Sequence, residues 1–347
     1  MIFPKNDFNK ISCHEANMDK HRLMDMFDKI HDEGINIHQM MVVKDGSKVF
    51  DAYAKDHQEK KENVYSVAKS FTSIAIGILI DQGVLSLEDY VLFYFANELK
   101  KYEKGYESLK LKHLLTMTVG QKTDRYYGLS EQHNPIEIFF NTPLIHQPGE
   151  VFYYSNFTTL MLSIIVTKVT GKTLNEFLDK HLYQKIGLKN VKCKQYKEYT
   201  VGCTGLFLSA SDMARFGLLL LNEGNWNGEQ IVSKSYLRLA TSQHIETKNE
   251  NNDTLGYGFQ FWLNECQDFK AAGLYQQLII VHKAYDLVFS CIAYEPKRDL
   301  TQLFCDYILP ACQKGYKDTY LSLKDAKKRL EIDSQALLLA EKKTRTY

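Results

Sequence analysis

The chain has 347 residues, of which 44% are hydrophobic and 24% charged. This length predicts one large domain with an insertion or two lobes, and this composition excludes a disordered chain. Lys and Arg number 43 against 42 Asp and Glu, so the formal charge is +1 and no global charge attracts nucleic acid or an anionic membrane.

The N-terminal region is predicted to form a helix followed by a β-hairpin. Apolar residues recur at helical spacing within residues 19–34, and Gly34 is a stop signal. Two strand-like runs follow, at residues 39–43 and 48–53. Asp45-Gly46 joins them and is a strong hairpin signal.

The middle of the chain, residues 66–245, is predicted to be mainly helical. Ser209 and Asp212 would cap a helix that runs to residue 221. Short strands are then expected at 257–264, 269–274, 278–282 and 287–294, with a final helix at 299–312. This order predicts an α+β fold, in which an antiparallel sheet built from both chain ends carries flanking helices and a large helical insertion.

The predicted domain boundaries follow from this order of elements. Residues 1–65 and 246–312 would form the sheet lobe and residues 66–245 the helical lobe. Residues 246–253 are polar and predict a loop. Residues 313–347 are rich in charge and predict a solvated tail.

Cysteine usage and the apolar runs bear on the compartment. The seven cysteines are scattered without a CxxC pair, which predicts reduced thiols in a cytoplasmic protein. The start of the chain does not resemble a secretory signal. The longest apolar run, residues 74–80, is far below the ~20 residues that span a bilayer. The 11 histidines show no ligand-like spacing, so no metal site is expected.

The first candidate for catalysis is Ser66-Val67-Ala68-Lys69, which fits the pattern Ser-x-x-Lys. An apolar run follows, so Ser66 would open a buried helix. Residues three apart lie on one helix face, which puts the Lys69 ammonium beside the Ser66 hydroxyl. A neighbouring cation or base and a helix N-terminus both favour a nucleophile at this position.

The second candidate is Tyr154-Ser155-Asn156. The turn at Pro148-Gly149 predicts a loop that carries Tyr154 and Asn156 ahead of a helix at residues 158–169. A cation beside a phenol favours the phenolate. Tyr154 could then accept the serine proton, while the Asn156 amide binds a substrate carbonyl.

These two motifs and a glycine-bearing strand near Gly273 follow the order of the penicillin-recognising serine enzymes. From about residue 15 to residue 312 the chain resembles the class C β-lactamase-like serine hydrolases. That group also contains DD-peptidases, esterases and nylon-oligomer amidases. The resemblance implies a β-lactamase/transpeptidase-like fold and no cofactor. It implies catalytic roles for Ser66, Lys69 and Tyr154, and substrate-binding roles for Asn156, Gly273 and Leu274.

The third motif of this group departs from its usual form. Residues 271–277 read AAGLYQQ, with Ala271 where relatives carry a basic residue or its variants and Gln276 where many carry glycine. A cation for a substrate carboxylate is therefore missing there, which argues against efficient β-lactam hydrolysis. A neutral ester or amide fits better.

The sequence thus predicts a serine hydrolase that cleaves a small-molecule ester or amide through an acyl-enzyme on Ser66. Two alternatives stay open. One is a peptidase acting on D-amino acids or cell-wall fragments, or a weak β-lactamase. The other is a non-catalytic ligand-binding protein on the same fold. Neither nucleic acid nor a membrane is an expected partner, and the oligomeric state is not predicted.

Overall fold

A computed structural model of the chain describes residues 2–247, 254–264 and 269–312. The predicted tail at 313–347 and most of the predicted loop at 246–253 lie outside these residues. The chain divides into two compact units. Of the described residues, unit 1 comprises 2–62, 208–222 and 272–312, and unit 2 comprises 63–207, 223–247, 254–264 and 269–271.

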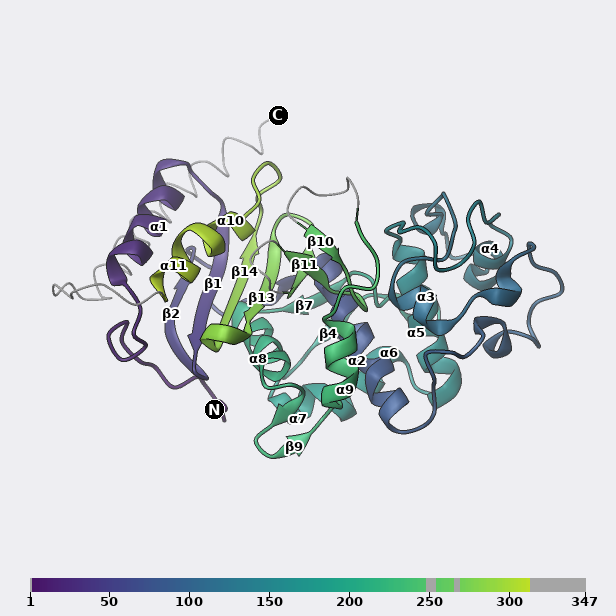
Figure 1. Cartoon of the computed structure of the whole chain (residues 1–347), viewed down its shortest axis with the longest axis horizontal. Helices are drawn as coiled ribbons and strands as arrows, with labels where there is room; N and C mark the ends of the chain where they lie inside the picture. The colour runs from purple at the N-terminus through teal and green to yellow at the C-terminus, as the bar shows by residue number, and fades with distance from the viewer. Residues whose placement is uncertain (1, 248–253, 265–268, 313–347) are drawn as a thin grey trace. The chain divides into compact units, whose positions relative to one another are not determined.

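Unit 1 is built on antiparallel strands from both chain ends (Figure 1). The strands lie in the order β13-β14-β1-β2, with Met41 opposite Ser290 on one side and Asp51 on the other. In the hairpin between β1 and β2, Asp45 and Gly46 both have positive φ, as a tight two-residue turn requires. The predicted hairpin is therefore confirmed. The strand bounds are β1 Ile37–Lys44, β2 Ser47–Tyr53, β13 Gln277–His282 and β14 Leu287–Ala293.

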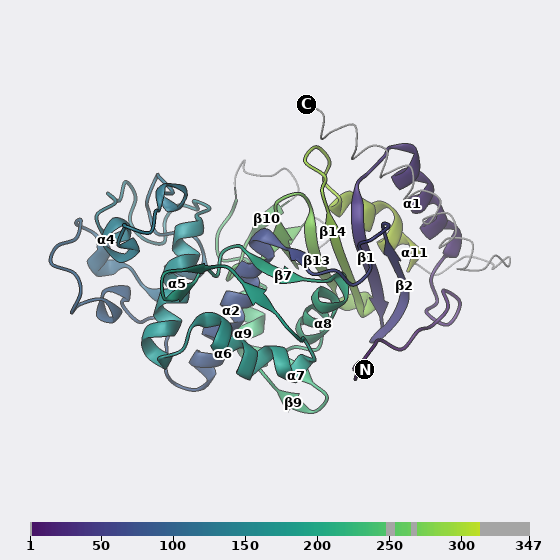
Figure 2. The same ribbon diagram turned by 180° about the vertical axis from the view of Figure 1, so that it is seen from behind.

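Helices cover both faces of these strands (Figures 1 and 2). Side chains alternate along a strand, so Phe289 of β14 faces the core that α1 and the C-terminal helices share, while Ser290 donates to Ala210 O of α8. The helix bounds are α1 Lys20–Asp32, α8 Ala210–Leu221, α10 Thr301–Leu303, η7 Phe304–Ile308 and α11 Leu309–Ala311. The last three form the helical run that the sequence predicts at 299–312.

Helix α8 begins as predicted but belongs to unit 1 rather than to the helical part. Ser209 accepts the N–H of Asp212 in a capping box. At Gly217 an added Cβ would lie 2.4 Å from Cγ1 of Val288, so glycine permits close approach to β14. In the other direction, the described residues between 246 and 271 fall in unit 2 and not in the sheet lobe. The predicted domain boundaries differ from the structure at both places.

Unit 2 is mainly helical, as predicted. Helix α2 is buried along almost its whole length, and Gly77 within it faces the ring of Tyr236. The helix bounds are α2 Ala68–Asp81, α3 Leu111–Leu115, α4 Pro135–Phe140, α5 Asn156–Thr170, α6 Leu174–Leu178, α7 Gln184–Ile186 and α9 Lys234–Ala240, with short turns η1 Tyr65–Val67, η2 Val91–Tyr94, η3 Tyr106–Ser108, η4 Tyr126–Gly128 and η5 Asp179–Tyr183.

Short strands complete unit 2, and three of them, β3, β7 and β12, contain points in the sequence where the chain changes unit. Their bounds are β3 Glu62–Asn63, β4 Lys192–Cys193, β5 Gln195–Tyr196, β6 Tyr199–Thr200, β7 Leu206–Leu208, β8 Asn225–Trp226, β9 Glu229–Gln230, β10 Thr254–Tyr257, β11 Trp262–Asn264 and β12 Phe269–Gly273. The single strand predicted at 257–264 is wrong, because the chain turns between β10 and β11. There Phe259 N–H donates to Ala240 O and Gln260 N–H to Leu115 O, so this backbone bonds to helical segments instead of a strand.

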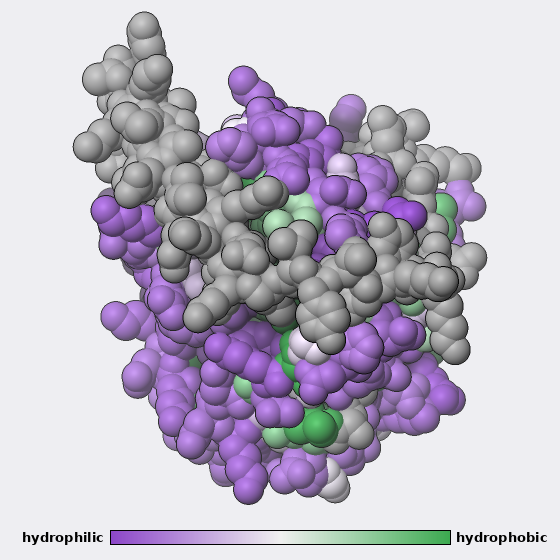
Figure 3. Space-filling model, turned by 90° about the vertical axis from the view of Figure 1, so that its left-hand side faces the viewer, coloured by the Kyte–Doolittle hydropathy of each residue, from purple (hydrophilic) through white to green (hydrophobic). Residues whose placement is uncertain are grey.

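Among the described residues, the prediction of reduced cysteines is wrong at Cys305, which is disulfide-bonded. Five others carry free thiols, namely Cys13, Cys193, Cys203, Cys291 and Cys312. Among the helices of the described residues, none is long and apolar enough to cross a membrane. The face drawn in Figure 3 is largely hydrophilic where described residues form it, with apolar atoms exposed only in small spots.

Candidate active site

The predicted nucleophile, Ser66, lies immediately before the buried helix α2. Ser66 is half-buried in the turn η1, which continues directly into α2. Lys69 is the second residue of α2 and only 1% exposed. Its Nζ donates to Ser66 Oγ at 2.9 Å. The three-residue spacing therefore brings the two groups into contact, as the sequence predicts.

The backbone before Ser66 is held in an uncommon conformation. Tyr65 has φ +46°, a left-handed value that costs a non-glycine residue about 1–3 kcal/mol. Neighbouring bonds sustain it: Asn63 Oδ1 accepts the N–H of Tyr65 at 3.0 Å and that of Gly205 at 3.2 Å. In addition, Val64 N–H donates to Leu206 O at 2.8 Å. The Ser66 turn is thus fixed by bonds to residues far along the chain.

Lys69 makes three hydrogen bonds, which is the full donor capacity of an ammonium. Besides Ser66, Nζ donates to Asn156 Oδ1 at 2.7 Å and to Cys203 O at 2.9 Å. Within the described residues no carboxylate pairs with it. A buried cation without an anionic partner favours negative charge developing beside it, such as a serine alkoxide or a tyrosine phenolate. When it is protonated, Lys69 has no lone pair for the Ser66 proton.

Tyr154 lies beside the same ammonium. Lys69 Nζ is 4.9 Å from the centroid of its ring. The ring stacks on Trp262, with centroids 5.3 Å apart, and meets Tyr257 edge-on at 6.3 Å. Its hydroxyl makes no hydrogen bond with the described residues. The aromatic contacts therefore place the ring, while the hydroxyl stays available for proton transfer.

Asn156 is the first residue of α5, not part of a loop as predicted, because Ser155 is the N-cap and accepts the N–H of Thr158. Both polar atoms of its side-chain amide are hydrogen-bonded. Oδ1 accepts from Lys69 Nζ, and Nδ2 donates to Tyr127 Oη at 2.8 Å. A substrate carbonyl bound to Nδ2 would take the place of this tyrosine.

Asp124 fixes the backbone at the start of α5. Its Oδ2 accepts the N–H of Asn156 at 2.8 Å, and its Oδ1 accepts the N–H of Tyr126 at 3.0 Å. A carboxylate at a helix N-terminus stabilises the helix dipole. Asp124 therefore joins the segment of Tyr126 and Tyr127 to the helix that presents Asn156.

Cys203 is the other potential nucleophile near Lys69. Its thiol is buried, and burial raises its pKa to about 11, although the Lys69 charge acts in the opposite direction. A neutral thiol is a poor nucleophile, so this side chain is a weaker candidate than the predicted nucleophile Ser66. Its backbone oxygen positions Lys69 instead.

Comparison with known proteins identifies the family of this fold and site. The pattern of the family described as "Beta-lactamase" matches residues 25–293. The chain belongs to the β-lactamase family. This assignment confirms the resemblance seen in the sequence and the α+β fold of the two units.

Individual members of the family are more distant. The chain is 28% identical over 172 residues to protein flp of Staphylococcus aureus strain MW2, a match that covers 45% of this chain and 34% of that relative. The match therefore spans about a third of the relative's length.

Solved structures are similar at the level of the fold. The octameric penicillin-binding protein homologue from Pyrococcus abyssi superimposes with a TM-score of 0.69 at 19% identity, covering 84% of this chain and 77% of that one. EstCE1, a hydrolase with promiscuous acyltransferase activity, gives a TM-score of 0.68 at 16% identity, covering 86% and 98%. These TM-scores support the β-lactamase fold. Sequence identities this low leave the substrate open.

Four of the six predicted site residues come together in unit 2: Ser66, Lys69, Tyr154 and Asn156. The other two, Gly273 and Leu274, belong to unit 1, at the end of β12 and in the following turn. Tyr275 and Gln276 in that turn both have positive φ. The substrate-binding roles of Gly273 and Leu274 remain a prediction from the family resemblance.

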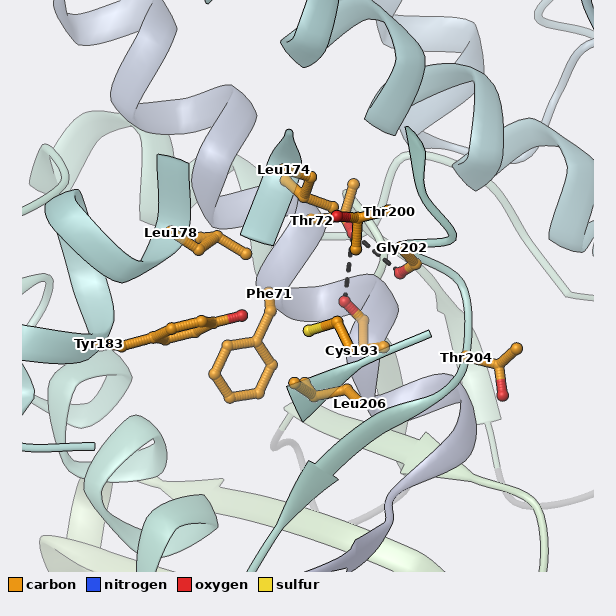
Figure 4. A pocket seen from close by; sticks show the side chains of 11 residues that line it. Phe71, Thr72, Leu174, Leu178, Tyr183, Cys193, Thr200, Gly202, Thr204 and Leu206 are labelled. Carbon is orange, nitrogen blue, oxygen red and sulfur yellow. Dashed lines mark hydrogen bonds between the residues drawn. The ribbon is translucent and has the colours of Figure 1, made fainter. Parts of the chain in front are cut away.

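A small cavity borders α2 on another side (Figure 4). Phe71, Leu174 and Leu206 contribute apolar walls, and Thr72 Oγ1 donates across it to Gly202 O at 2.9 Å. It has room for about one water molecule, and Ser66 does not line it. This cavity is a packing gap under the helix rather than a substrate pocket.

Sequence reasoning missed two parts of the site. One is Asp124, whose carboxylate binds the backbone at the start of α5. A carboxylate just ahead of two tyrosines was the available signal. The other is the carbonyl of Cys203, for which the sequence offers no signal, because every residue carries a backbone oxygen.

Proposed function

We propose that this member of the β-lactamase family is a serine hydrolase that cleaves an ester or amide of a small molecule through a covalent acyl-enzyme on Ser66. The observation that carries the proposal is the buried Lys69 ammonium, which donates to Ser66 Oγ at 2.9 Å and to Asn156 Oδ1 at 2.7 Å. A charged group is costly to bury, and a protein that only binds a ligand gains nothing from aiming it at a serine.

The proposed reaction begins when Ser66 Oγ attacks the substrate carbonyl and its proton passes to Tyr154. Tyr154 acts as the base in its phenolate form, which the neighbouring Lys69 ammonium favours. The carbonyl oxygen becomes an oxyanion that accepts the N–H of Ser66 and, as the family resemblance implies, that of Leu274.

Collapse of this intermediate breaks the ester or amide bond, and the leaving group takes the proton from Tyr154. Water then attacks the acyl-enzyme and gives a proton to Tyr154, which passes it to Ser66 Oγ as the acid departs. Atoms and charges balance over the cycle, so no cofactor is required.

The proposed substrate is uncharged near the scissile bond. Ala271 stands where relatives place a basic residue, so a substrate carboxylate has no cation at this position. A D-amino-acid peptidase or weak β-lactamase, and a non-catalytic binder, are the alternatives that the experiment must separate.

Intact-mass spectrometry after incubation with a fluorophosphonate and, separately, with a β-lactam tests the proposal. We expect one phosphonate adduct in the native chain, none in Ser66→Ala, and an unchanged adduct in the matched control Ser235→Ala, which alters an exposed serine. A lasting β-lactam adduct on Ser66 would instead favour the peptidase alternative. Labelling by neither probe, with folding intact, would support the non-catalytic alternative and contradict the proposal.

A further inference from the structure

Three ligand-type side chains meet in unit 1 although they are spread over 25 residues of sequence. Glu62 lies between two imidazoles: its Oε2 is 2.7 Å from His38 Nδ1, and its Oε1 is 3.0 Å from His57 Nδ1. The planes of the two imidazole rings are inclined at 38° to each other, and their centroids are 4.1 Å apart. One ligand atom from each residue lies within 4.8 Å of the others. The spacing along the chain gives no indication of this cluster.

The cluster is held in place before any ligand arrives. Gln39 is fully buried and donates through Nε2 to Glu62 Oε1 at 3.2 Å and to Lys60 O at 2.6 Å. Its Oε1 accepts the N–H of Ala210 at 3.0 Å, so the amide cannot rotate freely. The His38, His57 and Glu62 side chains are 13%, 16% and 18% exposed. An ion could reach the site, while the carboxylate is oriented by a partner behind it, as in known metal sites.

The ligand types select a class of ion. Two imidazole nitrogens and a carboxylate suit zinc and its neighbours, which bind nitrogen at about 2.0–2.1 Å and oxygen at about 2.0–2.2 Å. Two donor atoms bound to one ion at such distances and at a tetrahedral angle lie about 3.3 Å apart. The present separations of 2.7 and 3.0 Å between His38 or His57 and Glu62 need only a small expansion. An ion would replace the protons now shared between the imidazoles and the carboxylate.

We propose that His38, His57 and Glu62 form a site for a divalent transition-metal ion of the zinc type, with a fourth position left to water. This proposal does not depend on the proposed chemistry at Ser66. The competing explanation is a purely structural pair of hydrogen bonds from two histidines to one glutamate.

Titration of the untagged, chelator-dialysed full chain with Co²⁺ and with Zn²⁺ tests the site. We expect saturation at one ion per chain and visible cobalt absorption typical of nitrogen and oxygen ligands. The near-ultraviolet charge-transfer band of cysteine ligation should be absent. Zinc should then displace the cobalt. A chain that takes up no stoichiometric ion, or that shows the thiolate band alone, overturns the proposal without any variant.

Variants locate the ion. His57→Gln and Glu62→Gln should each weaken binding by about 100-fold or more, since each removes a direct ligand. His14→Gln, which changes an exposed histidine, should bind as the native chain does. Circular dichroism of each variant checks the fold. Unchanged affinity in both folded ligand variants would place the ion elsewhere and refute the assignment.

Discussion

Replacing Tyr154 with phenylalanine separates its chemistry from its packing. The ring contacts with Trp262 and Tyr257 remain, and the lost hydroxyl has no hydrogen-bond partner among the described residues. The free energy of unfolding should therefore change by no more than about 0.5 kcal/mol. A general base contributes about 10²–10⁴-fold. The loss in kcat/KM should correspond to about 2.7–5.4 kcal/mol of transition-state stabilisation.

The assay is hydrolysis of a short-chain p-nitrophenyl ester, with urea unfolding measured on the same samples. Tyr153→Phe is the matched control, since it makes the same chemical change one residue away, at a hydroxyl that also has no hydrogen bond with the described residues. Its activity should stay within a few-fold of the native chain. If Tyr154→Phe retained activity within tenfold, Tyr154 would not be the base. A neutral Lys69, which then accepts the Ser66 proton, would replace it in the mechanism.

Two further predictions concern stability. Burial, aided by nearby lysines, lowers the pKa of His113 to about 4, below the ordinary value near 6.5, and Nδ1 accepts the Lys110 N–H. As the pH falls, the unfolded chain protonates His113 before the folded chain does. The free energy of unfolding should therefore fall by about 1–3 kcal/mol between pH 6.5 and pH 4. His113→Asn should flatten that slope in urea unfolding; an unchanged slope would contradict the assignment. Gly217→Ala should lower the free energy of unfolding by about 1–3 kcal/mol, because the added Cβ would lie 2.4 Å from Val288 Cγ1. Gly128→Ala, in open space, should cost little, and equal losses in both variants would refute the packing argument.

Sequence was most informative where structure depends on neighbours along the chain. The Asp45-Gly46 turn has the positive φ values that those residues favour, and the Ser209 cap is made with Asp212. The contact between Ser66 and Lys69 belongs to the same class, because three residues make nearly one helical turn.

Predictions failed where backbone groups or side chains bond to partners that the local sequence does not indicate. The strand expected at 257–264 is interrupted because Phe259 and Gln260 bond to helical segments of unit 2. The prediction of all-reduced cysteines failed at Cys305, since pairing depends on the spatial approach of two thiols. Neither outcome is encoded in local propensity.

Sequence by itself therefore determined the α+β class, the order of the motifs and the pairing of Ser66 with Lys69, because these depend on local periodicity and on residues close in the chain. Only the tertiary structure decided what surrounds them. The Lys69 ammonium is completed by Asn156 and by the carbonyl of Cys203, both distant in sequence. Such partners are chosen by where folding buries each polar group, since a buried donor must find an acceptor wherever the chain brings one.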